Sequence, residues 1–285
     1  MNSSFTISLS LSLSLSLSLS FSFFFFVQNF STTAALTYLN HFCPHTSLFT
    51  PNSTYESNLN TLLFSLSSAA TNSTNGFANA TTGQNPPDRA YGLFLCRGDV
   101  STSACSDCVA NGKRVILRRC QNQRAAVIWY DECMLRYDNR SFFSAMDLKP
   151  TLSMQNIANI TDPTQFAQVL AKTVDKIATR ASNGRSGKKV AVEEVNFTSL
   201  QKLYTLAQCT PDLTVLDCNS CLRAMISNLP KGRQGGRSFT LSCSVRFEVY
   251  PFYNASGVAA PAPSPSPLSP APAPAPTPAP ETRPK

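Results

Sequence analysis

The feature that most constrains what this chain can fold into is a cysteine spacing that occurs twice. Cys96-x8-Cys105-x2-Cys108 recurs, 113 residues further along, as Cys209-x8-Cys218-x2-Cys221. Each triplet is followed by another cysteine and, three to five residues after that one, by an arginine, an aromatic residue and an acidic residue. Agreement in both residue type and spacing predicts two tandem copies of one domain of ordinary size.

The two copies are predicted to span residues 36–148 and 152–254. Residues 1–35 hold no charged side chain, alternate leucine with serine before a phenylalanine-rich run, and end in small residues. That composition is typical of a secretory signal peptide, with a membrane anchor as the alternative interpretation. Residues 255–285 are rich in proline, alanine and serine. They are expected to form a disordered, polyproline-like tail that cannot build a core.

The sequence predicts a secreted, extracellular glycoprotein. Ten cysteines suit an oxidising compartment. Beyond the expected signal peptide no apolar run approaches the roughly 18 residues of a transmembrane helix, so no membrane span is expected in the mature chain. Sequons of the form Asn-x-Ser/Thr mark the expected glycosylation sites. They lie at Asn29, Asn52, Asn72, Asn79, Asn139, Asn159, Asn196 and Asn254.

The residues available for chemistry argue against an enzyme. Only two histidines occur, His41 and His45, and both precede the repeated motifs. The chain therefore has few histidines that could act as a general base or bind a metal ion. No catalytic residue, metal or cofactor is predicted. The net charge of +8 suits acidic polysaccharides, and no nucleic-acid partner is predicted.

One disulfide follows from the difference between the copies. Copy one has six cysteines and copy two has four, and the two missing ones correspond to Cys43 and Cys120. Their counterparts fall near Met154 and Arg233. Since a joint absence is what a lost bond leaves behind, Cys43–Cys120 is predicted to be a disulfide that stabilises copy one by about 4 kcal/mol. Copy two is expected to be the less stable half.

The four cysteines that both copies share permit three pairings in each copy, and spacing alone does not choose among them. Their Cys-x-x-Cys pairs also occur in thioredoxin-like redox sites and in zinc sites. Neither copy shows the alternating strand–helix pattern of a redox fold nearby, no histidine is close, and the compartment is expected to be oxidising. Structural disulfides are the favoured interpretation.

Hydrophobic periodicity predicts an α+β domain in each copy, with two helices on an antiparallel sheet. Trp129 and the many phenylalanine and tyrosine side chains are expected in the core. The predicted helices cover residues 55–70, a stretch from a cap at Ser101 or Ser103 toward Cys120, a stretch around 166–177, and 213–229. The predicted strands cover 90–96, 125–130, 133–138, 203–209 and a pair within 237–250.

These residues resemble the ginkbilobin-type cysteine-rich domain of plants, which occurs in pairs in cysteine-rich repeat secretory proteins and in the ectodomains of cysteine-rich receptor-like kinases. Besides the cysteine spacing, the stretches 130–137 and 231–237 are close to phrases typical of that family. The resemblance covers nearly all of residues 36–254 and implies about five antiparallel strands in each copy. It also implies the disulfides Cys43–Cys120, Cys96–Cys105, Cys108–Cys133, Cys209–Cys218 and Cys221–Cys243.

The resemblance further implies a binding site. Ginkbilobin resembles a mannose-binding antifungal lectin that uses an asparagine, an arginine and a glutamate. Copy two carries Gln155, Arg237 and Glu248 near the matching positions, and an amide, a guanidinium and a carboxylate can share sugar hydroxyls through hydrogen bonds. Copy one has lost two of the three, so it is not expected to bind mannose in this way. The alternative is that Arg237 and Glu248 form a structural ion pair.

Taken with the resemblance, these features predict extracellular recognition in plant defence or stress signalling. The expected partner is a cell-wall or microbial glycan, mannose in particular, or a cell-surface protein, and the expected location is the apoplast. Three alternatives are a redox sensor of the apoplast, a structural glycoprotein of the cell wall, and the truncated ectodomain of a receptor-like kinase.

Overall fold

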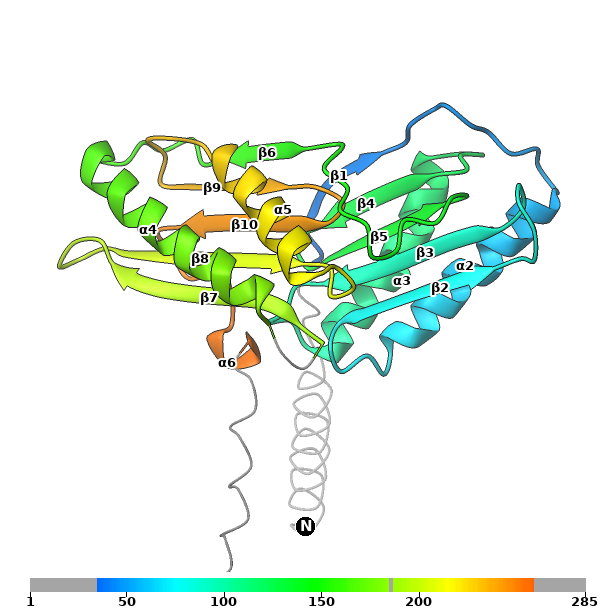
Figure 1. The fold of residues 1–285 in the computed structure, drawn as a ribbon, viewed down its shortest axis with the longest axis horizontal. Helices are drawn as coiled ribbons and strands as arrows, with labels where there is room; N and C mark the ends of the chain where they lie inside the picture. The colour runs from blue at the N-terminus through cyan, green and yellow to red at the C-terminus, as the bar shows by residue number, and fades with distance from the viewer. Residues whose placement is uncertain (1–34, 185–186, 259–285) are drawn as a thin grey trace, which may run out of the picture. The chain divides into compact units, whose positions relative to one another are not determined.

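The computed structural model describes residues 35–184 and 187–258. All but the last residue of the expected signal peptide, and the tail from residue 259 onward, lie outside the described residues. From Tyr38 the chain belongs to one compact unit that contains both copies (Figure 1). None of the described helices combines the length and the apolar composition that a membrane span requires.

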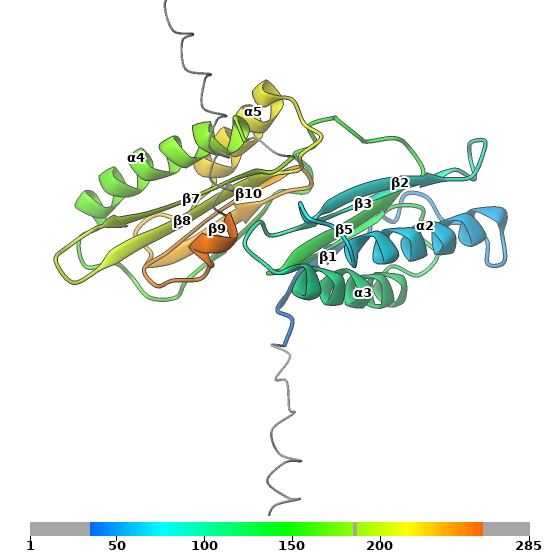
Figure 2. The ribbon, with the colours of Figure 1, turned by 90° about the horizontal axis from the view of Figure 1, so that it is seen from below.

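Copy one folds into two helices on one side of a five-stranded antiparallel sheet (Figure 2). The strands lie in the order β1-β4-β5-β3-β2 across the sheet. In chain order the elements are β1 (Tyr38–Phe42), α2 (Thr54–Ala70), β2 (Phe77–Thr82), β3 (Ala90–Cys96), α3 (Thr102–Arg119), β4 (Ala126–Tyr130) and β5 (Cys133–Asp138).

Copy two repeats this architecture, with the equivalent strand order β6-β9-β10-β8-β7. Its two long helices lie on the opposite side of their sheet from those of copy one in the view of Figure 2. In chain order the elements are β6 (Leu152–Gln155), α4 (Pro163–Ser182), β7 (Lys189–Asn196), β8 (Lys202–Cys209), α5 (Val215–Ser227), β9 (Gly235–Phe239) and β10 (Cys243–Glu248), followed by the short helix α6 (Ala255–Val258).

Each long helix starts at a polar residue that caps it. The side chains of Ser53, Ser101, Asp162 and Thr214 each accept a hydrogen bond from a backbone N–H of the first turn, at α2, α3, α4 and α5 respectively. Such a cap satisfies one of the amide groups that the helix leaves without an internal partner. The boundary at Ser101 agrees with one of the two caps predicted for α3.

The predicted fold class is confirmed, because each copy is an α+β domain with two helices on an antiparallel sheet. Periodicity found the long helices and the three central strands of each sheet, but it missed the edge strands β1, β2, β6 and β7. These strands are partly exposed and lack a clean alternation of buried and exposed positions. The tail expected from residue 255 is wrong for its first four residues, which form α6.

Five disulfides fasten helices to sheets, and they join the pairs that the resemblance implies. In copy one, Cys96–Cys105 and Cys108–Cys133 connect α3 to β3 and β5. The two bonds of copy two connect α5 to β8 and β10 in the same way. Cys43–Cys120 joins the residue after β1 to the C-terminal end of α3. All ten cysteines are paired.

The two faces of each sheet meet different neighbours, because successive side chains of a strand point to opposite sides. In β10, Val245 and Phe247 belong to the core that α4 and α5 cover. The positions between and beyond them, including Arg246 and Glu248, therefore point to the uncovered face. The uncovered faces of the two copies meet each other, and this contact is called the seam below.

Candidate binding site at the seam between the two copies

The apolar part of the seam is centred on an aromatic pair of equivalent residues. Trp129 of β4 and Phe239 of β9 each lie four residues before the last cysteine of their copy. Their rings meet edge to face with centroids 5.6 Å apart. The pair belongs to a buried cluster drawn from both copies, whose other members are Leu93, Val127, Met134, Phe142 and Leu241. The copies thus use the same position to contact each other, as two-fold related surfaces do.

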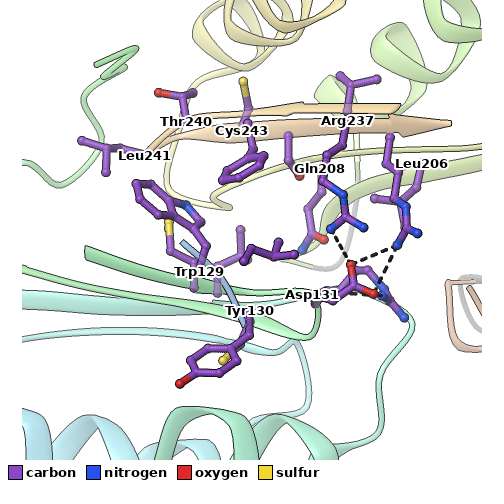
Figure 3. A pocket seen from close by; sticks show the side chains of 18 of the residues that line it. Trp129, Tyr130, Asp131, Leu206, Gln208, Arg237, Thr240, Leu241 and Cys243 are labelled. Carbon is purple, nitrogen blue, oxygen red and sulfur yellow. Dashed lines mark hydrogen bonds and ion pairs between the residues drawn. The ribbon is translucent and has the colours of Figure 1, made fainter. Parts of the chain in front are cut away.

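A carboxylate in the β4–β5 turn carries the polar part of the seam. Asp131 lies within ion-pair distance of three arginines, at 2.9 Å from Arg97, 2.6 Å from Arg237 and 3.0 Å from Arg246. Arg97 follows β3 of copy one, whereas Arg237 and Arg246 lie opposite each other on β9 and β10 of copy two. One side chain of copy one therefore holds two strands of copy two (Figure 3).

Two further carboxylates complete this charge cluster. Asp99 pairs with Arg97 at 2.5 Å and Glu248 pairs with Arg246 at 3.1 Å. Three guanidinium groups thus face three carboxylates, and the cluster carries no formal net charge. Arg246 also stacks over the ring of Phe252, with the guanidinium carbon 4.1 Å from the ring centroid. Its counterpart in copy one, Arg136, stacks over Phe142 in the same way.

The pKa values within the cluster reflect both burial and charge. Burial disfavours the ionised form of Asp131, but the charges of Arg237, Arg246 and Arg97 outweigh it, so its pKa lies below the ordinary value. Burial and the neighbouring charge of Arg246 lower the pKa of Arg237. The side chain of Arg237 is only 16% exposed. Asp131 is therefore charged at neutral pH and Arg237 is largely shielded from solvent.

An amide from copy two binds the backbone of copy one beside this cluster. Gln208 of β8 donates to the carbonyl of Cys96 at 2.9 Å and accepts from the amide of Gly98 at 3.1 Å. Gly98 approaches β7 so closely that a Cβ there would lie 2.7 Å from Val190 Cγ1, which explains why this position needs a glycine. In copy one the equivalent of Gln208 is Leu95, one residue before the first shared cysteine.

The seam contains a partly open pocket, called the seam cavity below, whose walls come from both copies (Figure 3). Leu95, Trp129 and Met134 line it from copy one, and Phe239 and Leu241 line it from copy two. Gln208, Asp131 and the three arginines of the charge cluster also line it. Trp129 Nε1 is buried and has no hydrogen-bond partner among the described residues.

The three residues predicted to bind mannose are not brought together. Arg237 lies on the seam face and is paired with Asp131. Glu248 lies on the same face, is 6% exposed, and accepts from Arg246 rather than pairing with Arg237. Gln155 lies opposite Gly236, which lies opposite the core residue Phe247. Alternation therefore turns Gln155 toward the other face of the sheet.

The register of the first strand explains the misplacement. Phe42 pairs with Val127, and Met154 pairs with Arg237, the equivalent of Val127. Met154 therefore corresponds to Phe42, and Gln155, not Met154, corresponds to Cys43. The residue that follows the cysteine position in copy two is accordingly Asn156. Asn156 donates its backbone N–H to Gly235, which lies opposite Glu248.

The predicted glycosylation sites can be located among the described residues. Six of the asparagines are exposed: Asn52, Asn72, Asn79, Asn159, Asn196 and Asn254. Asn139 is half-buried, and Asn29 lies outside the described residues. Over the described ranges no cluster of three or more His, Cys, Asp or Glu side chains could hold a metal ion.

The residues that join the copies were not predicted from the sequence. Trp129 was expected in the core and is buried, but the core it belongs to is shared with copy two. Asp131 and Gln208 were not singled out. A signal was available, since each is polar where the other copy has leucine, at Leu241 and Leu95. At each of these two positions the polar residue binds the other copy.

Comparison with known proteins agrees with the two-copy architecture. The family described as salt stress response/antifungal matches residues 42–140 and again 153–250. A cysteine-rich receptor-like protein kinase 25 of Arabidopsis thaliana is 46% identical over 237 residues, which are 81% of this chain and 35% of that protein. A cysteine-rich receptor-like protein kinase 8 of the same plant is 44% identical, over 79% of this chain and 33% of that protein.

A solved structure shows the same architecture. The tandem DUF26 ectodomain of the Arabidopsis thaliana cysteine-rich receptor-like protein PDLP5 matches with a TM-score of 0.60 and 28% identity, covering 75% of this chain and 99% of that one. The chain spans about a third of the length of the two kinases it matches.

Proposed function

Because this chain belongs to the salt stress response/antifungal family, we propose that it is an extracellular recognition protein of plant defence or stress signalling whose two copies act as one binding unit. The observation that carries the proposal is the seam, in which Asp131 of copy one binds Arg237 and Arg246 of copy two. A pair of independent modules would have no need of such a contact. The similarity to receptor-like ectodomains supports an extracellular location.

The relatives' kinase activity is not carried over to this chain. It matches only about a third of the two kinases compared above, and the matched part aligns with the ectodomain architecture of a receptor-like protein. We propose a role in binding rather than catalysis. The recognised partner would be a cell-wall or microbial glycan, or a cell-surface protein.

The finer form of the proposal is mannose binding in copy two. The register favours Asn156 over Gln155 as its amide, because Asn156 pairs with Gly235 next to Glu248. The burial of Glu248 and the pairing of Arg237 with Asp131 count against an open site of the type expected. A sugar at this position would have to compete with the charge cluster for both side chains.

A glycan array that includes mannans tests both levels of the proposal. We expect saturable binding of the purified chain to at least one glycan. If mannose is the ligand, Asn156→Ala should weaken binding about tenfold, which is the effect of losing one hydrogen bond to a sugar. Gln155→Ala is the matched control, since its side chain belongs to the other face, and it should bind normally. If the chain binds none of the glycans in a saturable way, the carbohydrate form of the proposal is contradicted.

The redox alternative finds little support in the fold. The two shared disulfides of each copy are buried, with the exposed fraction of their cysteines between 0% and 4%. Exchange requires an attacking thiolate to reach a sulfur atom, so buried bonds resist it. We infer that the disulfides are structural.

A further inference from the structure

Ser244 brings to the seam a hydroxyl group that no described residue binds. It follows the last cysteine of copy two, where copy one has Met134. Asp131 and Gln208 are likewise polar where the other copy has an apolar residue, but each of them binds the other copy. The Ser244 hydroxyl is unpaired without being fully buried, and Ser244 lines the seam cavity. The hydroxyl is therefore open to a ligand.

The sheet of copy two places this hydroxyl beside the arginines of the charge cluster. Ser244 and Arg246 are two residues apart on β10, so both side chains point to the seam face, about 7 Å apart along the strand. Arg237 of β9 lies opposite Arg246, and Phe239 of β9 lies opposite Ser244. A ligand group between these two rows can meet the hydroxyl and a guanidinium group together.

The side of the charge cluster that faces the seam cavity is positive. All three arginines of the cluster line the cavity, whereas Asp131 is the one carboxylate of the cluster that does. Asp99 and Glu248 balance the remaining charge, but they are 8% and 6% exposed and do not belong to the lining. Because the interaction between charges weakens with distance, the arginines dominate the electrostatic field at the cavity surface.

Arg237 has donors available for a ligand. The structure records one acceptor for its guanidinium group, the Asp131 carboxylate, which Nη1 reaches at 2.6 Å. Asp131 is shared with the other two arginines, each of which also has a carboxylate of its own. Within the described residues the Nε and Nη2 groups of Arg237 have no acceptor, and neither atom is fully buried. A second acceptor can therefore bind Arg237 without displacing Asp131.

The rest of the lining is mainly apolar and leaves room for a small molecule. Leu95 and Met134 of copy one and Phe239 and Leu241 of copy two belong to it. The centre of a water-sized sphere can move through about 90 Å³ of the cavity, several times the space that one water molecule needs. Apolar walls beside a hydroxyl and guanidinium donors suit a ligand that has an apolar body and one negatively charged group.

We propose that the seam cavity binds a small organic molecule in which one carboxylate is attached to an apolar body. The carboxylate accepts hydrogen bonds from Ser244 and Arg237, and the apolar body packs against Phe239 and Met134. Hydrogen bonds between a guanidinium group and a carboxylate are strong because both partners are charged. Apolar walls with a few polar groups are the usual composition of a small-molecule site. This inference goes beyond the glycan or protein recognition proposed above and does not depend on it.

Three probes test the two parts of this ligand. Benzoate has a carboxylate and an apolar ring, benzamide has nearly the same shape without the charge, and galacturonate carries its carboxylate on a hydroxylated ring. Saturation-transfer NMR with the purified full chain at neutral pH measures the affinity for each probe. We expect benzoate to bind with a dissociation constant of about 1 mM or below. It should bind about tenfold more tightly than either of the other probes.

The variant Ser244→Ala tests whether benzoate binds at the seam. No described residue bonds to this hydroxyl, so the variant should unfold at the same temperature as the unaltered chain. Its affinity for benzoate should fall about tenfold, the effect of losing one hydrogen bond to a charged group. Ser199→Ala is the matched control, because Ser199 is exposed between β7 and β8 and does not belong to the cavity lining. It should bind benzoate as the unaltered chain does.

Several results would overturn the proposal. They are a lack of saturable benzoate binding, equal affinities for benzoate and benzamide, and benzoate binding that Ser244→Ala leaves unchanged. Tighter binding of galacturonate than of benzoate would also overturn it, since the apolar walls would then contribute nothing. The glycan array tests the carbohydrate form of the proposed function separately, so either proposal can fail while the other stands.

Discussion

At the scale of single residues, Gln208 shows how one side chain can decide whether two repeats join. Its side-chain amide donates a hydrogen bond to the carbonyl group of Cys96, the last residue of β3, and accepts one from the backbone N–H of Gly98. Leucine at the equivalent position of copy one, Leu95, can do neither. Gln208 is 6% exposed, so water does not replace these hydrogen bonds easily.

Replacing Gln208 by leucine should lower the free energy of unfolding by about 2–4 kcal/mol, because two buried backbone groups lose their partners. Urea unfolding followed by circular dichroism measures the change. Gln168→Leu is the control, since Gln168 is an exposed residue of α4 and its replacement should cost less than about 0.5 kcal/mol. Equal stabilities for the two variants would show that the two hydrogen bonds of Gln208 do not stabilise the protein.

At the scale of elements, the copies differ most where a disulfide is present in one of them. Cys43–Cys120 closes a loop with a sequence separation of 77 residues and ties the edge strand β1 to α3. In copy two, β6 has no such tie. Its strand is only four residues long, and three of its four residues are exposed. The rest of the disulfide framework is the same in both copies.

Substituting both Cys43 and Cys120 by alanine should destabilise copy one by about 4 kcal/mol in the chain-entropy model. Native-state hydrogen exchange of the whole chain measures this copy by copy. In the unaltered protein we expect the amides of β3 and β5 to be better protected than those of β8 and β10. In the double variant the difference should vanish or reverse. Higher protection in copy two of the unaltered protein would contradict the expectation that it is the less stable half.

At the scale of the whole molecule, the seam makes one unit of the two repeats. Helices cover only one face of each sheet. Exposing the other, apolar face to water would be unfavourable. Trp129 and Phe239 shield each other from water by packing across the seam. Asp131 adds an ion pair with Arg237 beside them. The charge contact forms in one direction only, because the residue of copy two that corresponds to Asp131 is Leu241.

The seam should weaken in acid. The folded pKa of Asp131 lies below its ordinary value, so its contribution to stability is fully present above the ordinary carboxyl pKa of about 3.9. That contribution is lost as the pH falls from there through the folded pKa. Thermal unfolding between about pH 2 and pH 7, followed by the fluorescence of the single tryptophan, measures the effect.

Asp131→Asn is the control for this prediction. It should be less stable by about 2–3 kcal/mol at neutral pH, because three partly buried arginines lose their shared carboxylate. The variant should also show a flatter dependence of stability on pH in the acid range. An unchanged pH dependence would mean that other carboxylates govern acid unfolding.

Some features of this protein were determined by its sequence alone. The duplication, the fold class and the long helices follow from cysteine spacing and hydrophobic periodicity, because these depend on residues close together in the chain. Cys43–Cys120 followed from the comparison of the two copies, since a missing bond leaves two gaps. Edge strands escaped because half-exposed strands such as β2 carry a weak pattern.

Only the tertiary structure decided where the candidate site lies. Asp131 meets Arg237 and Arg246 across 106 and 115 residues of sequence, and no local pattern encodes such a meeting. The face of Gln155 depended on a register in which an error of one residue moves a side chain to the other side of the sheet. Sequence spacing fixes which residues share a strand, whereas pairing between strands and packing between copies fix which of them face each other.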